Sequence, residues 1–394
     1  MNFRETLDNF NTDTVAVGGL FGPRIGRIRE TARTKPEYQR NLLEAKRFYN
    51  EVLEGGRPIA QLQEALTTGD FPLLFADIID REMLADYVAS DKSWPLWAKR
   101  GTVPDFRNVN RFAIDGSEAV LAPVPQGDQY PESLLSDTRY TYAVGKYGRR
   151  IAFAWESMVN DDLDGLKSIP SRLARGAVRA EEKFATQLIA DANGPHATMF
   201  AAGNKNQIIL ANGSALANPI LSIAGLQNAM AVLSRQVDKD GEPIFIGAVT
   251  LVVPPALKVT ALNILNATEL WIVGDLGGGT ANQQVHAANW MKDKTELAVD
   301  YYLPIVSTTN GTTAWYLFAS PDAGRPAVEI GFLRGHENPE TFVKLADSQL
   351  LGGGVTDPSE GDFDTDSIQY KIRHVFGGTR EDPKMAVASN GTGV

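Results

Sequence analysis

The chain has 394 residues, 43% of them hydrophobic, and its 38 basic and 48 acidic residues give a formal net charge of −10. That length and apolar content suffice for two or three folded units with a substantial core. The absence of cysteine excludes disulfides, thiolate metal sites and cysteine nucleophiles. The negative net charge argues against a protein that binds nucleic acid with its whole surface.

The first 70 residues are predicted to form an arm, because their amphipathic helical stretch, 36–52, has too narrow an apolar face to fold alone. Between Phe21 and Asn50 the arm carries eight basic and three acidic residues. This excess could bind DNA, could bind the acidic face of a neighbouring copy, or could be a solvated helix face. The start of the chain lacks the features of a secretory signal, and its longest uncharged apolar stretch is too short to span a membrane.

A buried short helix is predicted over 71–88, and alternating strands follow at 112–116, 139–144 and 151–155. The polar, proline-interrupted segment 122–131 between them is predicted to project as a loop. The interpretation is a long protruding hairpin. Two strands alone cannot bury a face, so this hairpin is predicted to need a partner surface, most simply on another subunit.

The strongest helical pattern runs from about 168 to 193, and it ends at Asn193-Gly194-Pro195. A second helix is predicted after Ser222, a plausible N-cap, followed by a strand covered on both faces over 244–253 and a helix over 256–265. Further strands are predicted at 297–302, 314–318, 327–332, 341–345 and 368–375. After Gly377 we expect a polar, mobile tail.

A search for catalytic chemistry finds no motif. The four histidines lie in separate segments, without the spacing that places two metal ligands on one helix face. No G-x-S-x-G elbow occurs, and the glycine-rich stretch 274–280 lacks the ending of a phosphate loop. The carboxylates Asp161, Asp162 and Asp164 precede the long helix and suit its N-terminal dipole. We therefore predict no catalytic residues, no cofactor, no metal and no enzymatic activity.

An ordered set of segments resembles the major capsid protein family of tailed double-stranded DNA bacteriophages. The segments are 107–116, the long central helix, the helix 221–236 with 238–243 and 251–257, then 315–321, 328–335 and 370–377. Together they cover roughly residues 70 to 377. The resemblance implies an α+β capsid fold with a peripheral domain, a long spine helix, an axial α/β domain, an extended β-hairpin loop and an N-terminal arm.

On this resemblance the chain divides into seven parts. They are the N-terminal arm 1–70, the first peripheral part 71–99, the extended hairpin loop 100–156, the peripheral domain with the spine helix 157–221, the axial domain 222–325, the returning peripheral strands 326–377 and the C-terminal tail 378–394. The implied function is self-assembly into the hexamers and pentamers of an icosahedral head that encloses double-stranded DNA without sequence-specific binding.

The residues predicted to contact neighbouring subunits lie in the arm, the hairpin and the axial loop. They are Arg24, Arg27, Arg29, Arg33, Arg40, Arg47, Phe112, Val124, Tyr130, Leu134, Asp275 and Leu276. Possible further partners are scaffold, prohead protease, portal and decoration proteins. The expected location is the virion capsid, assembled in the bacterial cytoplasm, with no membrane contact. Two alternatives stay open: an encapsulin-like compartment shell, and an α/β enzyme acting on a small molecule.

Overall fold

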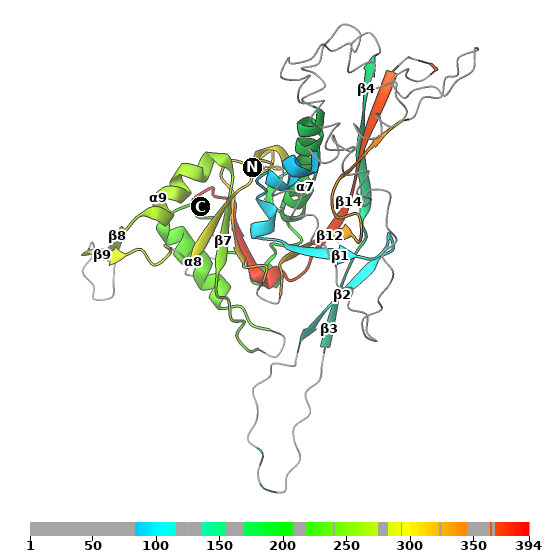
Figure 1. Ribbon diagram of the computed structural model, residues 1–394. Coiled ribbons are helices and arrows are strands. Elements are labelled where there is room, and N and C mark those ends of the chain that lie inside the picture. The colour runs from blue at the N-terminus through cyan, green and yellow to red at the C-terminus, as the bar shows by residue number, and fades with distance from the viewer. Residues whose placement is uncertain are drawn as a thin grey trace, which may run out of the picture. The chain divides into compact units, whose positions relative to one another are not determined.

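The residues that the computed structural model describes all lie within the unit Ala76–Val394. They are numbered 83–115, 124, 126, 136–154, 169–208, 218–238, 241–274, 283–292, 294–322, 325–344, 363–364 and 367–393. Two sheets, of five and four strands, and the helices α7, α8 and α9 dominate them (Figure 1). The fold therefore mixes helix and strand, as predicted.

The five-stranded sheet is organised by one long strand, β14 (Ser367–Arg380). One edge of β14 pairs with β4 (Gly145–Ala154), and the other pairs with β13 (Glu340–Val343) and β12 (Val328–Leu333). Strand β1 (Lys99–Val103) then joins β12 in parallel. The predicted strands that became β12, β13 and β14 are confirmed.

The four-stranded sheet has the order β10-β7-β11-β15. Its strands are β10 (Thr295–Val299), β7 (Val249–Val253), β11 (Trp315–Ala319) and β15 (Ala386–Ser389). Every residue of β7, β11 and β15 is buried. A strand that is covered on both faces has no polar side to alternate with its apolar side, which explains the continuous apolar runs in the sequence.

Two of the predicted strands in this sheet were too long. Strand β7 begins at Val249 rather than 244. Its pairing with β11 begins at Val249, opposite Ala319, whereas Ile244 donates its backbone N–H to the Gln236 carbonyl at 3.0 Å, outside the sheet. Strand β10 ends at Val299, because the carboxylate of Asp300 accepts the backbone N–H of Tyr302 at 2.7 Å. That bond turns the chain into the short helix α10 (Leu303–Val306).

Helices cover one face of the four-stranded sheet. Helix α8 (Ile223–Ser234) begins at the predicted N-cap, where the Ser222 hydroxyl accepts the N–H of Gly225 at 3.1 Å. The helix predicted over 256–265 is present as α9 (Lys258–Asn266), and its first residues form the 3₁₀ turn η4 (Pro255–Leu257) instead. Both helices pack apolar residues against this face of β7, β11 and β15, including Leu226, Leu233, Ile264, Leu251, Leu317 and Val387.

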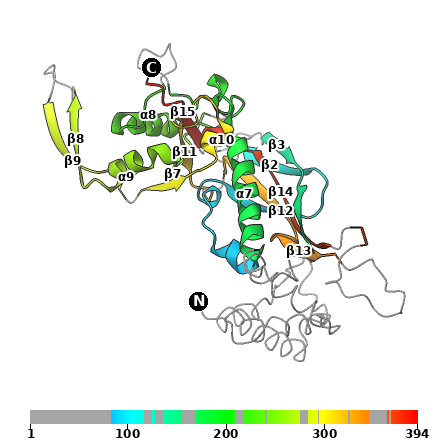
Figure 2. The same ribbon diagram turned by 90° about the horizontal axis from the view of Figure 1, so that it is seen from above.

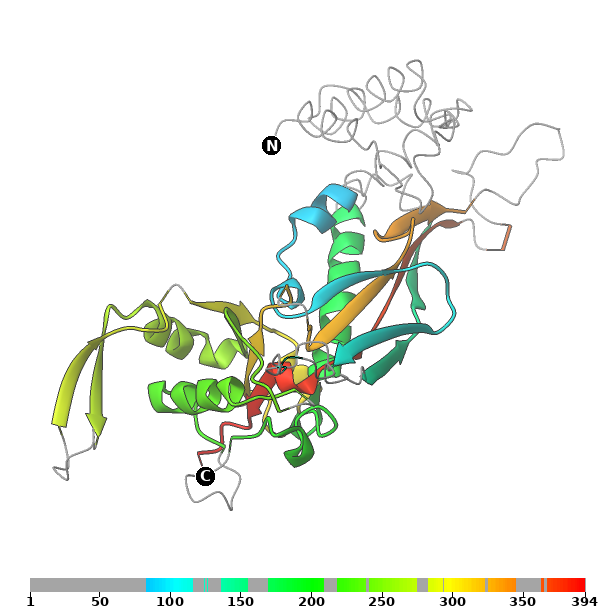
Figure 3. The same ribbon diagram turned by 90° about the horizontal axis from the view of Figure 1, so that it is seen from below.

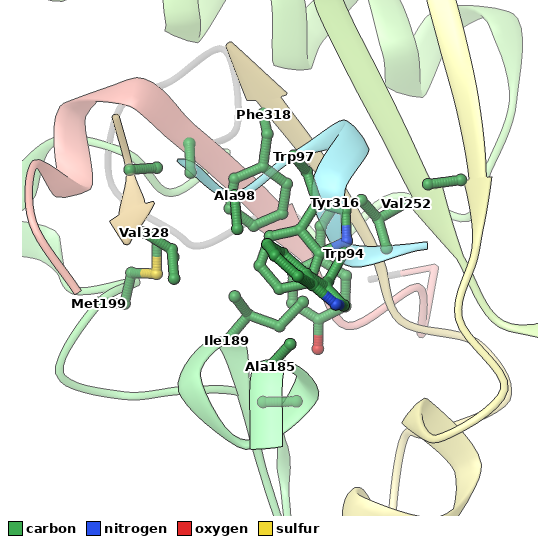
Figure 4. Packing of buried hydrophobic residues seen from close by; sticks show 14 of the residues in the cluster. Trp94, Trp97, Ala98, Ala185, Ile189, Met199, Val252, Tyr316, Phe318 and Val328 are labelled. Atoms are coloured by element: carbon green, nitrogen blue, oxygen red, sulfur yellow. The ribbon is translucent and has the colours of Figure 1, made fainter. Parts of the chain in front are cut away.

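The other face of the same sheet meets a second core, which it shares with helix α7 (Ile169–Ile189) and the 3₁₀ turn η2 (Trp94–Leu96) (Figure 4). The Trp97 ring stacks on Phe318 with 5.2 Å between centroids. The hydroxyl of Thr250 donates to the Leu96 carbonyl at 2.9 Å. These contacts hold the segment before β1 between the two sheets.

Helix α7 lies along one face of the five-stranded sheet (Figure 3), with Leu173 and Ala177 in one apolar cluster with Ile372. The predicted helix extended to 193, but α7 ends at Ile189. The guanidinium of Arg380 donates to the carbonyl of Leu188 at 2.5 Å, which occupies an acceptor at the helix end. The chain then forms the strand pair β5 (Ala190–Asp191) and β6 (Gly194–Pro195).

The segment 378–394 was expected to be a mobile, polar tail, and this expectation is wrong for its described residues. Strand β14 continues to Arg380, the turn η6 (Pro383–Met385) follows, and β15 pairs with β11. The side chain of Val387 is fully buried. The short run of small apolar residues has weak strand propensity, so its pattern did not predict a buried strand.

Besides the short β5–β6 pair, two longer hairpins of the described residues lie outside these sheets. Strands β2 (Val109–Asp115) and β3 (Ser136–Tyr142) pair with each other, as do β8 (Glu269–Gly274) and β9 (Gln283–Ala288). Figure 2 shows β8 and β9 standing apart from the five-stranded sheet. The strands predicted at 112–116 and 139–144 pair with each other as β2 and β3, but the strand predicted at 151–155 pairs with β14 as part of β4 and does not belong to this hairpin.

Candidate functional site

The β2–β3 hairpin is the main candidate for contact with another molecule. Among the described residues it has no third strand, and Phe112 on β2 is 57% exposed. Val109, at its base, packs against a small apolar cluster that includes Tyr142 and Val375. The hairpin is thus fixed to the subunit at one end and offers an exposed aromatic side chain further along.

A buried acid anchors the base of the hairpin. The carboxylate of Glu329, on β12, accepts hydrogen bonds from Arg111 Nε at 2.8 Å and from the Tyr142 hydroxyl at 2.5 Å. Arg111 also donates to the Thr102 carbonyl on β1 at 3.1 Å. A side chain at position 331 would collide with the Tyr142 ring, so Gly331 leaves the space that the phenol occupies. Charge-assisted bonds of this kind fix direction as well as position.

A second acid lies beside this anchor. Glu381 follows β14, and its backbone N–H donates to the Ala327 carbonyl at 2.8 Å. Burial, reinforced by the hydrogen bond and negative charge of Glu329, raises the pKa of Glu381 to about 8. Burial also opposes ionisation of Glu329, but the bonds from Tyr142 and Arg111 outweigh it and lower the pKa of Glu329. At neutral pH one carboxyl of the pair is therefore protonated and the other ionised.

Replacing Glu381 with Gln is expected to make the subunit less sensitive to alkaline pH. Because the pKa of Glu381 is raised on folding, the native protein loses stability as pH increases from about 4.5 through about 8. The loss is on the order of 1–2 kcal/mol once screening at this half-buried position is allowed for. Urea unfolding across that range should show a decline for the wild type and a flatter curve for E381Q. Parallel curves for the two proteins would contradict the assignment.

A second buried cluster ties the chain before β1 to helix α7. The carboxylate of Glu181 lies 2.6 Å from His374 Nε2, accepts the Trp94 indole N–H at 3.2 Å, and also accepts the Tyr87 hydroxyl. Lys92 Nζ lies 3.5 Å from the same carboxylate. Burial opposes ionisation of Glu181, yet these partners outweigh it and lower its pKa. The cluster joins three segments that are remote in sequence.

A cavity of about 750 Å³ lies between residues 91–96, helix α7, strand β10 and helix α10. The carboxylate of Glu182, which lines this cavity, accepts hydrogen bonds from the backbone N–H and the hydroxyl of Ser93, each at 2.6 Å. This carboxylate therefore holds the wall of the cavity together. In the part of the chain that the structure describes, no three metal-ligating side chains come together.

The structure places few of the predicted contact residues. Phe112 is exposed on β2, and Val124 is half-buried. Outside the described residues lie Arg24, Arg27, Arg29, Arg33, Arg40, Arg47, Tyr130, Leu134, Asp275 and Leu276. Sequence reasoning missed the Glu329 and Glu181 anchors, because each joins residues far apart in the chain and has no local pattern. None of the described helices combines the length and the apolar character needed to cross a bilayer.

The chain is similar to one family of known proteins and to several solved structures. A family model described as "Phage capsid protein" matches residues 138–389. No curated protein matches the chain. Among solved structures, the capsid of Ralstonia phage GP4 is 9% identical, with 74% of this chain and 86% of that chain covered, at a TM-score of 0.47.

Two further solved structures are similar to this chain to a comparable degree. A virus-like particle from Pyrococcus furiosus is 12% identical, with 80% of this chain and 99% of that chain covered, at a TM-score of 0.43. A protein of Microbacterium phage Oxtober96 is 11% identical, with coverages of 76% and 91%, at a TM-score of 0.44. All three scores lie below 0.5, so the family match carries the assignment.

Proposed function

Since this chain belongs to the phage capsid protein family, we infer that it is a major capsid protein and that its place is the capsid of the virion. The match spans most of the described strands and helices, from β3 to β15. The family is structural, so its subunits act by assembling. We propose that copies of this chain form hexamers and pentamers that close into an icosahedral head around double-stranded DNA.

The observation that best supports assembly is the β2–β3 hairpin, which has no third strand among the described residues, exposes Phe112 and is held at its base by Glu329. A two-stranded sheet is marginal in water, so it gains stability by covering a neighbour. The same reasoning applies to the β8–β9 hairpin. We propose that Tyr130, Leu134, Asp275 and Leu276, in the segments that connect the paired strands, contact adjacent subunits.

Under the same proposal, each part of the fold has a place in the capsid subunit. Helix α7 would be the spine of a peripheral domain built on the five-stranded sheet, and the four-stranded sheet with α8 and α9 would be the axial domain. The proposed boundaries need two changes. Strand β15, from the segment 378–394, completes the four-stranded sheet, and β1 and β4, which fall largely within the range 100–156 given to the hairpin loop, pair in the five-stranded sheet. The basic arm would contact the shell interior or an acidic neighbour. Scaffold, protease, portal and decoration proteins are proposed as further partners.

Replacing residues 117–134 with a short Asn-Gly turn is expected to leave a folded subunit that no longer forms closed shells. The strands and the Glu329 anchor remain, so thermal unfolding of the subunit should change little, while the surface that reaches a neighbour is removed. Negative-stain electron microscopy and a sizing column would show this, with the chain expressed alone and with its scaffold and protease.

A matched pair of single variants refines the test. Phe112→Ser removes an exposed ring from the hairpin, whereas Phe106→Ser removes a ring of similar exposure, 55%, from the loop between β1 and β2. We expect the first to lower the yield of shells and the second to leave it near the wild type. Normal shells from the shortened hairpin would refute its role in assembly. Shells filled with protein cargo and free of DNA would favour the encapsulin-like alternative.

A further inference from the structure

The solvent-facing side of helix α7 carries positive charge along most of its length. At steps of three and four residues it presents Arg172, Arg175, Arg179 and Lys183, all exposed. We call these four residues the α7 basic stripe. The two acidic residues of the helix, Glu181 and Glu182, are turned inward and buried. A chain with a net charge of −10 thus has a helix face with four positive charges and no negative one.

The stripe has no ion-pair partner among the described residues. None of its four side chains forms a hydrogen bond or an ion pair with another described residue, although the inward-facing Glu181 pairs with Lys92 and His374. Gly176 lies within the stripe, and a Cβ atom there would meet no atom within 4 Å. The space in front of the helix is therefore open to a ligand.

The chemistry of this face favours a nucleic-acid backbone over a protein as its binding partner. Apart from the stripe, the exposed positions of helix α7 that the structure describes are Gly176 and Gln187, so this part of the helix itself presents no exposed apolar side chain, although the exposed Tyr301 and Ile305 line the same cavity as Arg179. A stable protein interface needs a desolvated apolar centre, whereas a nucleic-acid backbone needs only positioned cations. Arginine, which supplies three of the four charges, binds phosphate oxygens in a bidentate manner.

We propose that the α7 basic stripe binds the phosphate backbone of the duplex DNA enclosed by the shell. The proposal rests on the proposed function. From Arg172 to Lys183 the helix rises about 16 Å, a length over which a duplex carries roughly ten phosphate charges. Contacts of this kind are independent of sequence. One stripe binds weakly, but many copies in a shell act together on one DNA molecule.

The test measures binding of a short duplex of random sequence to soluble subunits or capsomers by fluorescence anisotropy, from low to physiological salt. In the test variant, Arg172, Arg175, Arg179 and Lys183 are all changed to Gln. The control variant loses the same charge from exposed positions on β4 and β14, through Lys146, Arg149, Arg150 and Lys371 changed to Gln.

For the wild type and the control we expect affinity to fall steeply with salt. For the test variant we expect weaker binding and a log–log slope smaller by about 0.9 for each phosphate that is no longer neutralised, up to about 3.6 for four. Gly176→Glu is expected to weaken binding as well, because it places an acid among the four cations without removing any. Circular dichroism of both variants checks that the helix is retained.

Three results would overturn the proposal: wild-type subunits that do not bind the duplex, a test variant with the wild-type slope, or equally weakened binding in test and control. Shell formation, scored in parallel by electron microscopy, separates this proposal from the proposed function. Shells that form normally from a variant with weakened DNA binding support the stripe as a phosphate site. Failed assembly with unchanged DNA binding would instead identify it as a protein contact, and the capsid assignment would stand.

Discussion

A chain that ends at Glu381 is expected not to fold. The truncation removes β15, which pairs with β11, and with it Met385 and Val387, both almost completely buried, from two different cores. Burying one such side chain contributes about 1.5–3 kcal/mol. Together with the lost backbone pairing and the exposed edge of β11, the deficit is comparable to the roughly 5–15 kcal/mol that typically separates native from unfolded protein.

The measurement is the yield of soluble protein, with circular dichroism and limited proteolysis of whatever remains soluble. The control is a chain that ends at Thr392, for which the one hydrogen bond lost among the described residues is that from the Gly393 N–H to the Asn218 carbonyl. That bond contributes about 1 kcal/mol, so the control should fold. A soluble, protease-resistant chain ending at Glu381 would show that β15 is dispensable.

Replacing Glu181 with Gln is expected to destabilise the subunit by about 3–5 kcal/mol, the usual effect of removing one partner from a buried ion pair. His374 and Lys92 would keep their places but lose the carboxylate charge that pairs with both. The segment that contains Tyr87 and Trp94 would also lose its attachment to α7. Urea unfolding of the subunit at neutral pH measures the change.

The control for this variant is Glu296→Gln, an identical chemical change at an exposed position on β10. Exposed substitutions of this kind alter stability by less than about 0.5 kcal/mol. If E181Q unfolds at the same urea concentration as E296Q, the cluster around Glu181 contributes little, and burial of the neighbouring aromatic rings must hold the segment instead.

Much of the secondary structure could be predicted from periodicity and turn chemistry. Ser222 was identified as an N-cap because a hydroxyl just before an apolar helical pattern can accept a free backbone N–H of the first helical turn. The run that contains β7 was recognised as a doubly covered strand because it lacks polar alternation. The strand ends were less predictable, since Ile244, in the run before β7, pairs with Gln236 outside the sheet and β10 stops where the Asp300 carboxylate binds the backbone.

The long-range parts could not be predicted from one sequence. Glu329 meets Arg111 across 218 positions and Tyr142 across 187, and nothing local marks any of the three as a partner of the others. The α7 basic stripe differs, because its steps of three and four can be read directly from the sequence. Only the structure shows that this face is open while the adjacent acids point inward.

The central position of β14 in its sheet has a consequence for the order of folding. Ser367 pairs with Ala154, far earlier in the chain, and β15 joins β11 later still. Both sheets therefore stay incomplete until these late strands have left the ribosome, and pairing over such separations is slow. The Glu329 anchor sits in the sheet that β14 completes, so we expect the hairpin to take its final position only after β14 has been made. If the hairpin contacts a neighbour as proposed, synthesis itself delays association until the subunit is whole.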